Sequence, residues 1–508
     1  MSWSAVNDIM PIAWPALAAT AVLVFGGRSA RGPAPMAPAL ALLGVVLSFV
    51  WIWGFWPLKE ARTLFAGAVQ LDDLGLFLGG LATFCAGATI LVSKDYLKRY
   101  DKNHAEYYAL VAFALSGMIL MVMSTNLISI LFGIEIMSVS LYVLCGFFRE
   151  DKRSVEASIK YFLTGSFATG LFLFGMANIF GATGSLDIAE IGRALSGEHP
   201  SPLIWLGTGF MLGGFAFKVA AVPFHQWLPD VYEGAPTVVT GYMATGVKIA
   251  AFGTMIRLFT EIYHQGAALR EVLWWIAVLT MTVGNVAALA QKSVKRMLAY
   301  SSIAHAGYIL VGLVVMSGTG LGADKSIVAT DGSRGILYYV MAYAITNIGA
   351  FAILAFFERQ DGGGVSFDDL AGLRQRFPRA SLALTVFMLS LAGIPGTAGF
   401  IGKYLIFGAA LEAGSKVSRD SFVVLAILGI LNSLIGLYYY LRVPIQLYVK
   451  PLPDDGKRFP GMPAGVALTF VVFLATAGTL WFGCGPAIFG TGVEPALTMV
   501  AAALKSLR

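Results

Sequence analysis

Three lysines and one glutamate stand inside long apolar segments of this sequence. They are Lys218 in "GGFAFKVAAVPF", Lys248 in "TGYMATGVKIAAFG", Lys403 in "GFIGKYLIF" and Glu135 in "SILFGIEIMSVSLY". A charged side chain at the centre of a bilayer costs roughly 2.5–3.5 kcal/mol on insertion scales, so these groups must face protein, water or one another. A buried lysine with a nearby counter-charge can release and regain a proton near neutral pH. These residues therefore predict a proton relay.

Two histidines are candidates for the same relay. His225 follows Lys218 by seven residues and would share its helical face if the helix continued. His305 lies in "LAYSSIAHAGY", where Ser301, His305 and Tyr308 share one helical face. A lone histidine in an apolar helix is more often a hydrogen-bonded core group. For both histidines, the relay and the core role therefore remain open.

A purely structural alternative is a buried pair of Lys218 and Glu135 that only fixes helix packing. A lysine and a glutamate can compensate each other's charge in the membrane interior. This explanation covers two of the four charges and leaves Lys248 and Lys403 without an acid of their own. We therefore favour the relay.

The composition is that of a membrane protein. Of the 508 residues, 57% are hydrophobic and 13% are charged, whereas soluble proteins carry about 25% charged residues. The 58 glycines are typical of membrane helices that pack through small residues. We expect an all-α polytopic membrane protein with about fourteen transmembrane helices. Their ranges are 10–27, 37–57, 73–93, 106–123, 125–147, 156–181, 203–222, 236–259, 271–290, 297–316, 335–357, 380–410 (interrupted), 421–441 and 462–484.

The loop charges predict the orientation. If both termini lie outside, most loop lysines and arginines fall on the inner side, for example in 94–102, 149–153 and 292–296. The positive-inside rule then places both termini on the periplasmic side of the cell inner membrane. The net charge of +6 reflects this bias and gives no reason to expect nucleic acid.

Two expected spans are interrupted at corresponding positions. Pro223 and Pro229 follow Lys218, and "GIPGTAG" precedes Lys403. Paired breaks of this kind indicate inverted repeats, so we expect two inverted five-helix repeats with broken helices 7 and 12. The predicted division is 1–105 for an N-terminal three-helix segment, 106–260 and 261–450 for the repeats, and 451–508 for a C-terminal helix and tail.

Motifs for bound cofactors are not found in the sequence. The three cysteines, Cys85, Cys145 and Cys484, are far apart and form no CxxC pair, so no iron–sulfur, zinc or disulfide site is expected. There is no Walker loop, and no GxGxxG motif follows a strand. We expect this chain to hold no flavin, NADH, ATP or metal itself.

The sequence resembles the antiporter-like membrane subunits of respiratory complex I, the proton-pumping NADH:quinone oxidoreductase, and among them subunit N. The matching motifs include "LFGIEIMSVSLYVLCGF", "FKVAAVPFHQWLPDVYEGAPT", "LAYSSIAHAGY" and "GIPGTAGFIGKYLIF", in order, over about residues 70 to 445. The resemblance implies a translocase subunit with Glu135 and Lys218 as a pair, Lys248 as the central lysine and Lys403 as the terminal lysine. It also implies that FMN, iron–sulfur clusters and quinone belong to partner subunits, and that subunits M and K are the neighbours.

Subunits M and L of the same complex and the subunits of sodium/proton antiporters share parts of this pattern. Subunit M typically has glutamate where Lys403 stands, and subunit L has a long C-terminal lateral helix. Multisubunit sodium/proton antiporter subunits share the lysines but usually differ after "WLPD", where this chain reads "VYEGAP". Two departures from the family pattern are Val238 and Gly396, where proline is common. The rival functions are a sodium/proton antiporter subunit and a non-pumping structural membrane subunit.

Overall fold

The computed structural model describes residues 3–26, 36–58, 60–195, 201–262, 267–317, 325–358, 365–417, 420–452 and 465–489. The first part of the chain forms α1 (Trp3–Gly26), α2 (Ala37–Phe55), β1 (Arg62–Leu64), β2 (Val69–Leu71), α3 (Asp73–Arg99), α4 (Ala105–Met123), α5 (Leu127–Cys145), α6 (Lys152–Thr183) and α7 (Ile188–Leu195). The middle part forms α8 (Pro202–Val219), α9 (Trp227–Gly234), α10 (Thr237–Tyr242), the π-helical turn η1 (Met243–Val247), α11 (Lys248–Glu261), α12 (Ala267–Leu289) and α13 (Val294–Met316). The last part forms α14 (Lys325–Phe357), the 3₁₀ turns η4 (Asp368–Leu370) and η5 (Leu373–Gln375), α15 (Pro378–Ala392), α16 (Ala398–Val417), α17 (Asp420–Tyr448) and α18 (Val466–Phe489).

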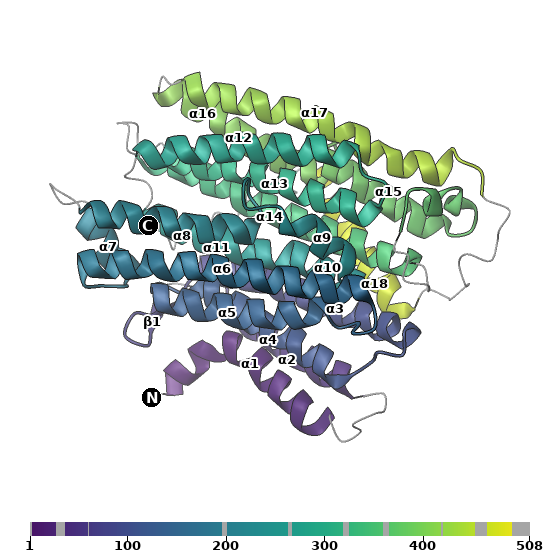
Figure 1. The fold of residues 1–508 in the computed structure, drawn as a ribbon, viewed down its shortest axis with the longest axis horizontal. Helices are drawn as coiled ribbons and strands as arrows, with labels where there is room; N and C mark the ends of the chain where they lie inside the picture. The colour runs from purple at the N-terminus through teal and green to yellow at the C-terminus, as the bar shows by residue number, and fades with distance from the viewer. Residues whose placement is uncertain are drawn as a thin grey trace.

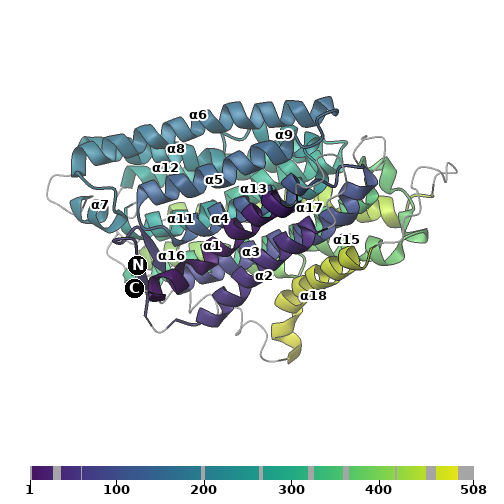
Figure 2. The same ribbon diagram turned by 90° about the horizontal axis from the view of Figure 1, so that it is seen from below.

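The long helices lie side by side in one bundle. Figure 1 shows α1 and α2 at one edge and α16 and α17 at the other, and Figure 2 shows α6 on the side opposite α18. We call the end where α3 and α17 finish and α6 and α13 begin the basic end. It lies on the right in Figure 1, away from α7 and β1. At this end Lys102 contacts Glu150, and Arg442 of α17 contacts the carbonyl of Leu289, the last residue of α12.

The helical membrane class is confirmed, whereas the number of spans is not. Twelve described helices are long and apolar enough to cross a membrane. The expected span 236–259 is divided among α10, η1 and α11, and the span 380–410 between α15 and α16. Neither composite span consists of a single helix of sufficient length and hydropathy. The count of fourteen therefore stays a prediction, and so do the domain boundaries.

Two groups of helices pack in the same order. In the first group α4 packs on α5, α5 on α6, and α6 on α8; in the second α12 packs on α13, α13 on α14, and α14 on α15 and α16. The interrupted element follows the third helix in each group, as the expected repeats require. This packing is consistent with two five-helix repeats placed around a common centre.

The two breaks end their first half-helices in the same way. Helix α8 is followed by Ala220 with φ 57°, and α15 by Gly393 with φ 87°. The amide of Ala221 donates to the Ala216 carbonyl and that of Ile394 to the Leu389 carbonyl, five residues back in each case. These are Schellman caps, which satisfy carbonyls that would otherwise lie unpaired at a helix end. The expected broken helices are therefore present, and the break survives the departure at Gly396.

The central helices α13 and α14 carry a cluster of buried polar side chains. In the most apolar window of α13 and of α14, 94% of the residues are buried, against 22% for α1 and α18. Buried Ser301, Ser302 and His305 lie on α13, and Tyr339 and Tyr343 on α14. Because these helices are surrounded by protein, their polar groups can be paired with one another instead of facing lipid.

A buried ion pair joins the N-terminal segment to the helix that contains Lys248. Asp72 accepts hydrogen bonds from both terminal nitrogens of Arg257, at 2.6 and 2.5 Å, and caps the first turn of α3. Nε of Arg257 donates to the Val122 carbonyl at 2.6 Å. The Asp72 side chain is fully buried and that of Arg257 is 5% exposed. This pair was not expected, because Arg257 lies near the end of an apolar span.

Replacing Arg257 with leucine should destabilise the protein strongly. The change leaves the Asp72 carboxylate buried without its cation, and breaking a buried pair in this way costs about 3–5 kcal/mol. We expect a lower thermal midpoint of the purified, detergent-solubilised protein. Arg193→Leu is the control, since Arg193 forms a solvent-exposed pair with Glu190. Equal midpoints for the two variants would contradict the structural role of Arg257.

Candidate functional site

Lys218 lies in the last turn of α8, directly before the first break. Its side chain is buried, and Nζ donates a hydrogen bond to Oγ of Ser138 at 2.7 Å. The ammonium also lies 5.9 Å from the ring centre of Tyr142. Ser138 in turn donates to the carbonyl of Ile134. The primary partner of Lys218 is thus a hydroxyl on α5.

Glu135 lies on α5, as Ser138 does, but does not pair directly with Lys218. Its carboxylate accepts a hydrogen bond from Thr169 of α6 at 2.7 Å, and the residue is half-buried. Among the described residues, no ion pair links Glu135 to Lys218. Ser138, which contacts Lys218, follows Glu135 by three residues, so the two contacts are one helical turn apart on α5. Glu135 therefore acts on Lys218 electrostatically and not through a direct bond.

His225 lies in the break itself. The helix ends at Val219, so His225 does not share a helical face with Lys218 as a continuous helix would require. The residue is half-buried, and its Nδ1 has no hydrogen-bond partner in the described part of the chain. The break is held to α12 by a bond from the Val222 amide to the Thr280 hydroxyl at 3.0 Å. No contact in the described structure joins His225 to the lysines.

Lys248 is the first residue after the π-helical turn η1. Nζ donates to the backbone carbonyl of Ser302 on α13 and lies 5.0 Å from the ring centre of Tyr343. The Ser302 hydroxyl accepts a hydrogen bond from Tyr343 at 2.9 Å. A single π-helical turn inside an α-helix is often found at functional sites, because it changes the direction of the side chains that follow.

His305 lies between two tyrosine hydroxyls. Nδ1 is 2.6 Å from the Tyr339 hydroxyl, and Nε2 is 2.9 Å from the Tyr440 hydroxyl. Tyr440 also shares a hydrogen bond with Ser301 at 2.5 Å. A neutral imidazole accepts at one nitrogen and donates at the other, and each hydroxyl can do either. His305 can therefore pass a proton from one tyrosine to the other by exchanging tautomers.

Lys403 reaches back from α16 to the end of α15. Nζ donates to the carbonyls of Leu391 and Ala392, at 3.0 and 2.8 Å, and to the Ser433 hydroxyl on α17 at 2.7 Å. A cation is favourable at this place because the last carbonyls of a helix carry partial negative charge. The ammonium also lies 5.2 Å from the ring centre of Tyr308.

These contacts form one continuous row from Lys248 to Lys403. The Lys248 ammonium faces the Tyr343 ring, which is 5.1 Å from the His305 ring. The His305 ring is 5.6 Å from that of Tyr308, which faces Lys403. We call this series the polar row. It places three of the six residues expected from the sequence in one cluster.

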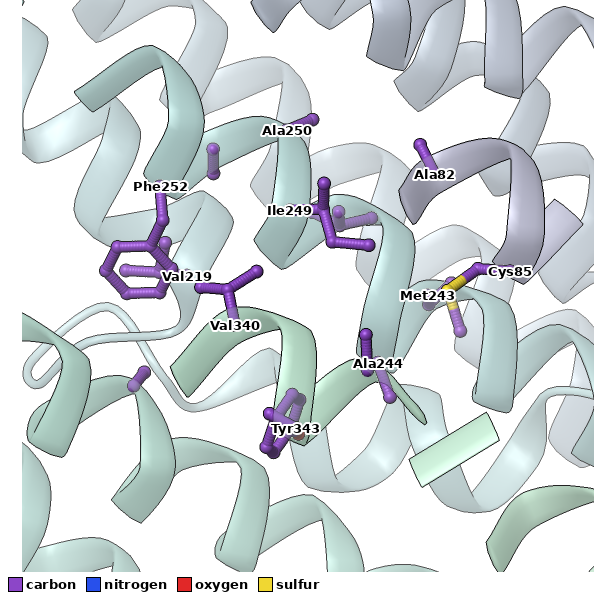
Figure 3. Close-up of a cluster of buried hydrophobic side chains, with 14 of the residues drawn as sticks. Ala82, Cys85, Val219, Met243, Ala244, Ile249, Ala250, Phe252, Val340 and Tyr343 are labelled. Atoms are coloured by element: carbon purple, nitrogen blue, oxygen red, sulfur yellow. The ribbon is translucent and has the colours of Figure 1, made fainter. Parts of the chain in front are cut away.

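Among the described residues, Lys218 is not joined to the polar row by a hydrogen bond or a ring contact. Its neighbour Val219 and the neighbour of Lys248, Ile249, belong to one buried cluster with Phe252 and Val340 (Figure 3). No hydrogen bond in the described part of the chain joins Lys218 to Lys248. Lys218 and Glu135 thus lie with their hydroxyl partners in a second polar group.

The partners of these charges were not expected from the sequence. They are Ser138, Thr169, Tyr339, Tyr343, Ser433 and Tyr440. The sequence could have indicated two of them, because Tyr339 and Tyr343 are four residues apart and so share one face of α14. The described residues contain no group of three or more His, Cys, Asp or Glu side chains that could hold a metal ion.

The matching family model is described as "NADH:quinone oxidoreductase/Mrp antiporter, TM", and it covers residues 124–430. NADH-quinone oxidoreductase subunit N of Trichlorobacter lovleyi is 41% identical over 97% of each chain. Subunit N 1 of Chloroherpeton thalassium is 41% identical over 88% of this chain and 89% of its own.

Solved structures are similar as well. A chain of respiratory complex I from Thermus thermophilus matches with a TM-score of 0.76 and 31% identity, over 97% of this chain and 99% of its own. A chain of the Mrp complex from Dietzia matches with a TM-score of 0.82 at 20% identity, over 100% of this chain and 98% of its own. The second likeness concerns the fold alone.

Substitutions of Lys403 should separate its structural and its charge-carrying roles. Lys403→Met leaves the Leu391 and Ala392 carbonyls without their side-chain donor, whereas Lys403→Gln keeps an N–H donor without the charge. We expect faster amide hydrogen exchange at residues 393–400 in Lys403→Met and near wild-type exchange in Lys403→Gln. Equal exchange in both variants would show that the ammonium does not hold this break.

Proposed function

Because the chain belongs to the NADH:quinone oxidoreductase/Mrp antiporter family, and within it to subunit N of NADH-quinone oxidoreductase, we propose that its buried charges carry protons across the membrane. The chain is a membrane subunit of a translocase complex. The proposed carriers are Lys218, Lys248, His305 and Lys403, and Glu135 is the counter-charge on the Lys218 side.

The polar row is the observation that supports this proposal most directly. Lys248, His305 and Lys403 are 3%, 3% and 6% exposed, and tyrosine rings fill the space between them. A row of ionisable groups costs free energy in a membrane unless it is paired, and such groups in membrane proteins usually mark ion or proton pathways. The hydroxyls of Tyr339 and Tyr440 provide His305 with a proton donor and acceptor on opposite sides of its ring.

The Lys218 group supplies the second stage of the relay. Glu135 is held by Thr169, and Lys218 by Ser138, one turn away on α5. When the Glu135 carboxylate approaches, it favours the charged form of Lys218; when it withdraws, the burial of Lys218 favours loss of the proton. Val219 and Ile249, the neighbours of Lys218 and Lys248 in the sequence, lie in one apolar cluster with Phe252 (Figure 3). Transfer across it requires water to enter.

We assign the redox chemistry to other subunits. FMN, iron–sulfur clusters and quinone are expected in partner subunits, because no cofactor-binding motif was found in this sequence. We infer that subunits M and K are the neighbours in the membrane arm and that the chain lies in the cell inner membrane. Both termini would face the periplasm, because the basic end then faces the cytoplasm.

Replacing Lys248 with methionine should abolish proton transfer without preventing assembly. Methionine fills a similar volume but cannot hold a proton, so the polar row is interrupted at its first member. We expect NADH-driven proton transport by the assembled complex to fall at least tenfold. Lys94→Met is the control, because Lys94 is exposed on α3. Unchanged transport in an assembled Lys248→Met complex would rule out the relay.

Gentle extraction of a tagged chain tests the assignment to a redox-driven complex. We expect an NADH-oxidising assembly that contains flavin and iron–sulfur centres to be recovered with it. Sodium-dependent transport by an assembly without redox centres would instead support the antiporter alternative. A scaffold role requires that neutralising Lys248 impairs assembly and leaves the transport of assembled complexes unchanged.

A further inference from the structure

A second group of buried charges lies at the basic end, outside the polar row. Nζ of Lys295 on α13 is 3.7 Å from a carboxylate oxygen of Glu358, which follows α14. Their side chains are 3% and 8% exposed. The other Glu358 oxygen accepts a hydrogen bond from the Tyr96 hydroxyl at 2.7 Å, and its backbone carbonyl accepts one from Arg99. This is a buried acid–base pair that the relay described above does not use.

The pair lies beside the junction between α9 and α10. Lys295 donates to the carbonyl of Ala235 at 2.8 Å, and the amide of Thr237 donates to the Tyr96 hydroxyl at 3.2 Å. Ala235 follows α9, which is the second half of the first broken helix. Thr237 begins α10, from which the chain continues through η1 to Lys248. The pair therefore contacts the end of the broken helix directly and, through Tyr96, the start of the segment that contains Lys248.

Helix α9 connects this junction with the polar row. Tyr232, three residues before Ala235, is buried, and its hydroxyl interacts with the side chain of Ser302. The Ser302 carbonyl is the acceptor for Lys248. The hydroxyl of Thr240 donates to the Tyr232 carbonyl at 3.1 Å, which fixes α10 against α9. Helix α9 thus reaches from the junction to Ser302, the residue whose backbone carbonyl binds Lys248.

The same helix reaches the surface of the basic end. Asp230 accepts hydrogen bonds from Lys160 and Arg296, each at 2.7 Å, and Glu233 accepts one from Arg296 at 3.2 Å. Their side chains are 36% and 35% exposed, so water reaches them. Partial burial acts to raise the pKa of Asp230, but the bonds from Lys160 and Arg296 outweigh it and hold the pKa below its usual value. Lys295 also interacts electrostatically with Glu233.

We propose that Glu358, with Lys295 as its counter-charge, is the proton-loading station between the basic end and Lys248, and that Tyr232 and Ser302 complete the route. This inference rests on the proposed function. A proton from hydronium at the basic end binds the Glu358 carboxylate and leaves water. It then passes to neutral Lys248, and Glu358 returns to its charged form. Each hydroxyl on the route accepts one proton and releases another, so no net charge remains on it.

Single and double substitutions separate proton loading from helix packing. Glu358→Gln leaves Lys295 buried without its acid, so it weakens packing as well as removing the carrier. The double variant Lys295→Met/Glu358→Gln removes both charges, and loss of both members of a buried pair is often tolerated structurally. If the pair only holds helices together, the double variant recovers transport. If Glu358 carries the proton, the double variant assembles and stays at least tenfold below wild type in NADH-driven proton transport.

Tyr232→Phe tests the continuation of the route, and its matched control is Tyr161→Phe. Both tyrosines are buried, but the Tyr161 hydroxyl has no hydrogen-bond partner in the described structure. We expect at least a threefold loss of proton transport and a larger solvent isotope effect for Tyr232→Phe, and wild-type values for Tyr161→Phe. Glu358→Asp keeps the acid and should restore at least a third of the transport.

The outcomes distinguish this inference from the proposed function. Recovery of transport to within twofold of wild type in the double variant overturns the loading station. Normal transport in Tyr232→Phe overturns the route through Ser302. In both cases the relay stands if Lys248→Met remains inactive. Normal transport in assembled Lys248→Met overturns the relay and the loading station together.

Discussion

A lysine ammonium at membrane depth has three N–H donors, and each must find an oxygen, since lipid offers none. In this chain many of the oxygens are backbone carbonyls. Lys403 uses the carbonyls that end α15, Lys248 uses that of Ser302, and Lys295 uses that of Ala235 after α9. Helix ends therefore supply the acceptors for Lys403 and Lys295, at the end of α15 and of α9. The Ser302 carbonyl that binds Lys248 lies inside the uninterrupted helix α13.

The two broken helices end in the same type of cap but carry their lysines on opposite sides of the break. Both first halves end in a Schellman cap, at Ala220 and at Gly393. Lys218 precedes its cap by two residues and turns toward α5, whereas Lys403 follows its break and reaches back across it. In the proposed function the first charge responds to Glu135, whereas the second is held by the carbonyls that end α15.

The sequence predicts the buried charges and the breaks well, because both are local properties of the chain. An ionisable residue inside an apolar run, and proline or glycine beside it, require no knowledge of the neighbouring helices. The partners could not be predicted in the same way, since they depend on how each helix is rotated about its axis. Glu135 and Lys218 were expected to pair, yet α5 presents Ser138 to the lysine and Glu135 to Thr169. The role of His225 stays a prediction, and because the helix ends before it, His225 does not share a helical face with Lys218.

Charged residues near span ends show a further limit of sequence patterns. Lys295 was expected as one of the loop charges that set orientation, and Arg257 stood near the end of an apolar span. Both are buried and paired with acids that lie far away in the sequence, Glu358 and Asp72. A count of loop charges treats such residues as facing water. The packing of α3 against α11 brings Asp72 to Arg257, and the packing of α13 against α14 brings Glu358 to Lys295.

The apolar cluster that contains Val219 and Ile249, the sequence neighbours of Lys218 and Lys248, is as important to the proposed function as the charges. A hydrogen-bonded chain of hydroxyls and amines that ran from one membrane face to the other would conduct protons in both directions and dissipate the gradient. Here the polar row ends at Lys248, and Val219, Ile249 and Phe252 lie in the cluster beside it (Figure 3). Water enters such a region only when polar groups are available to bind it. A shift of the Lys218 charge would supply them, so that the state of Glu135 controls when the two stages communicate.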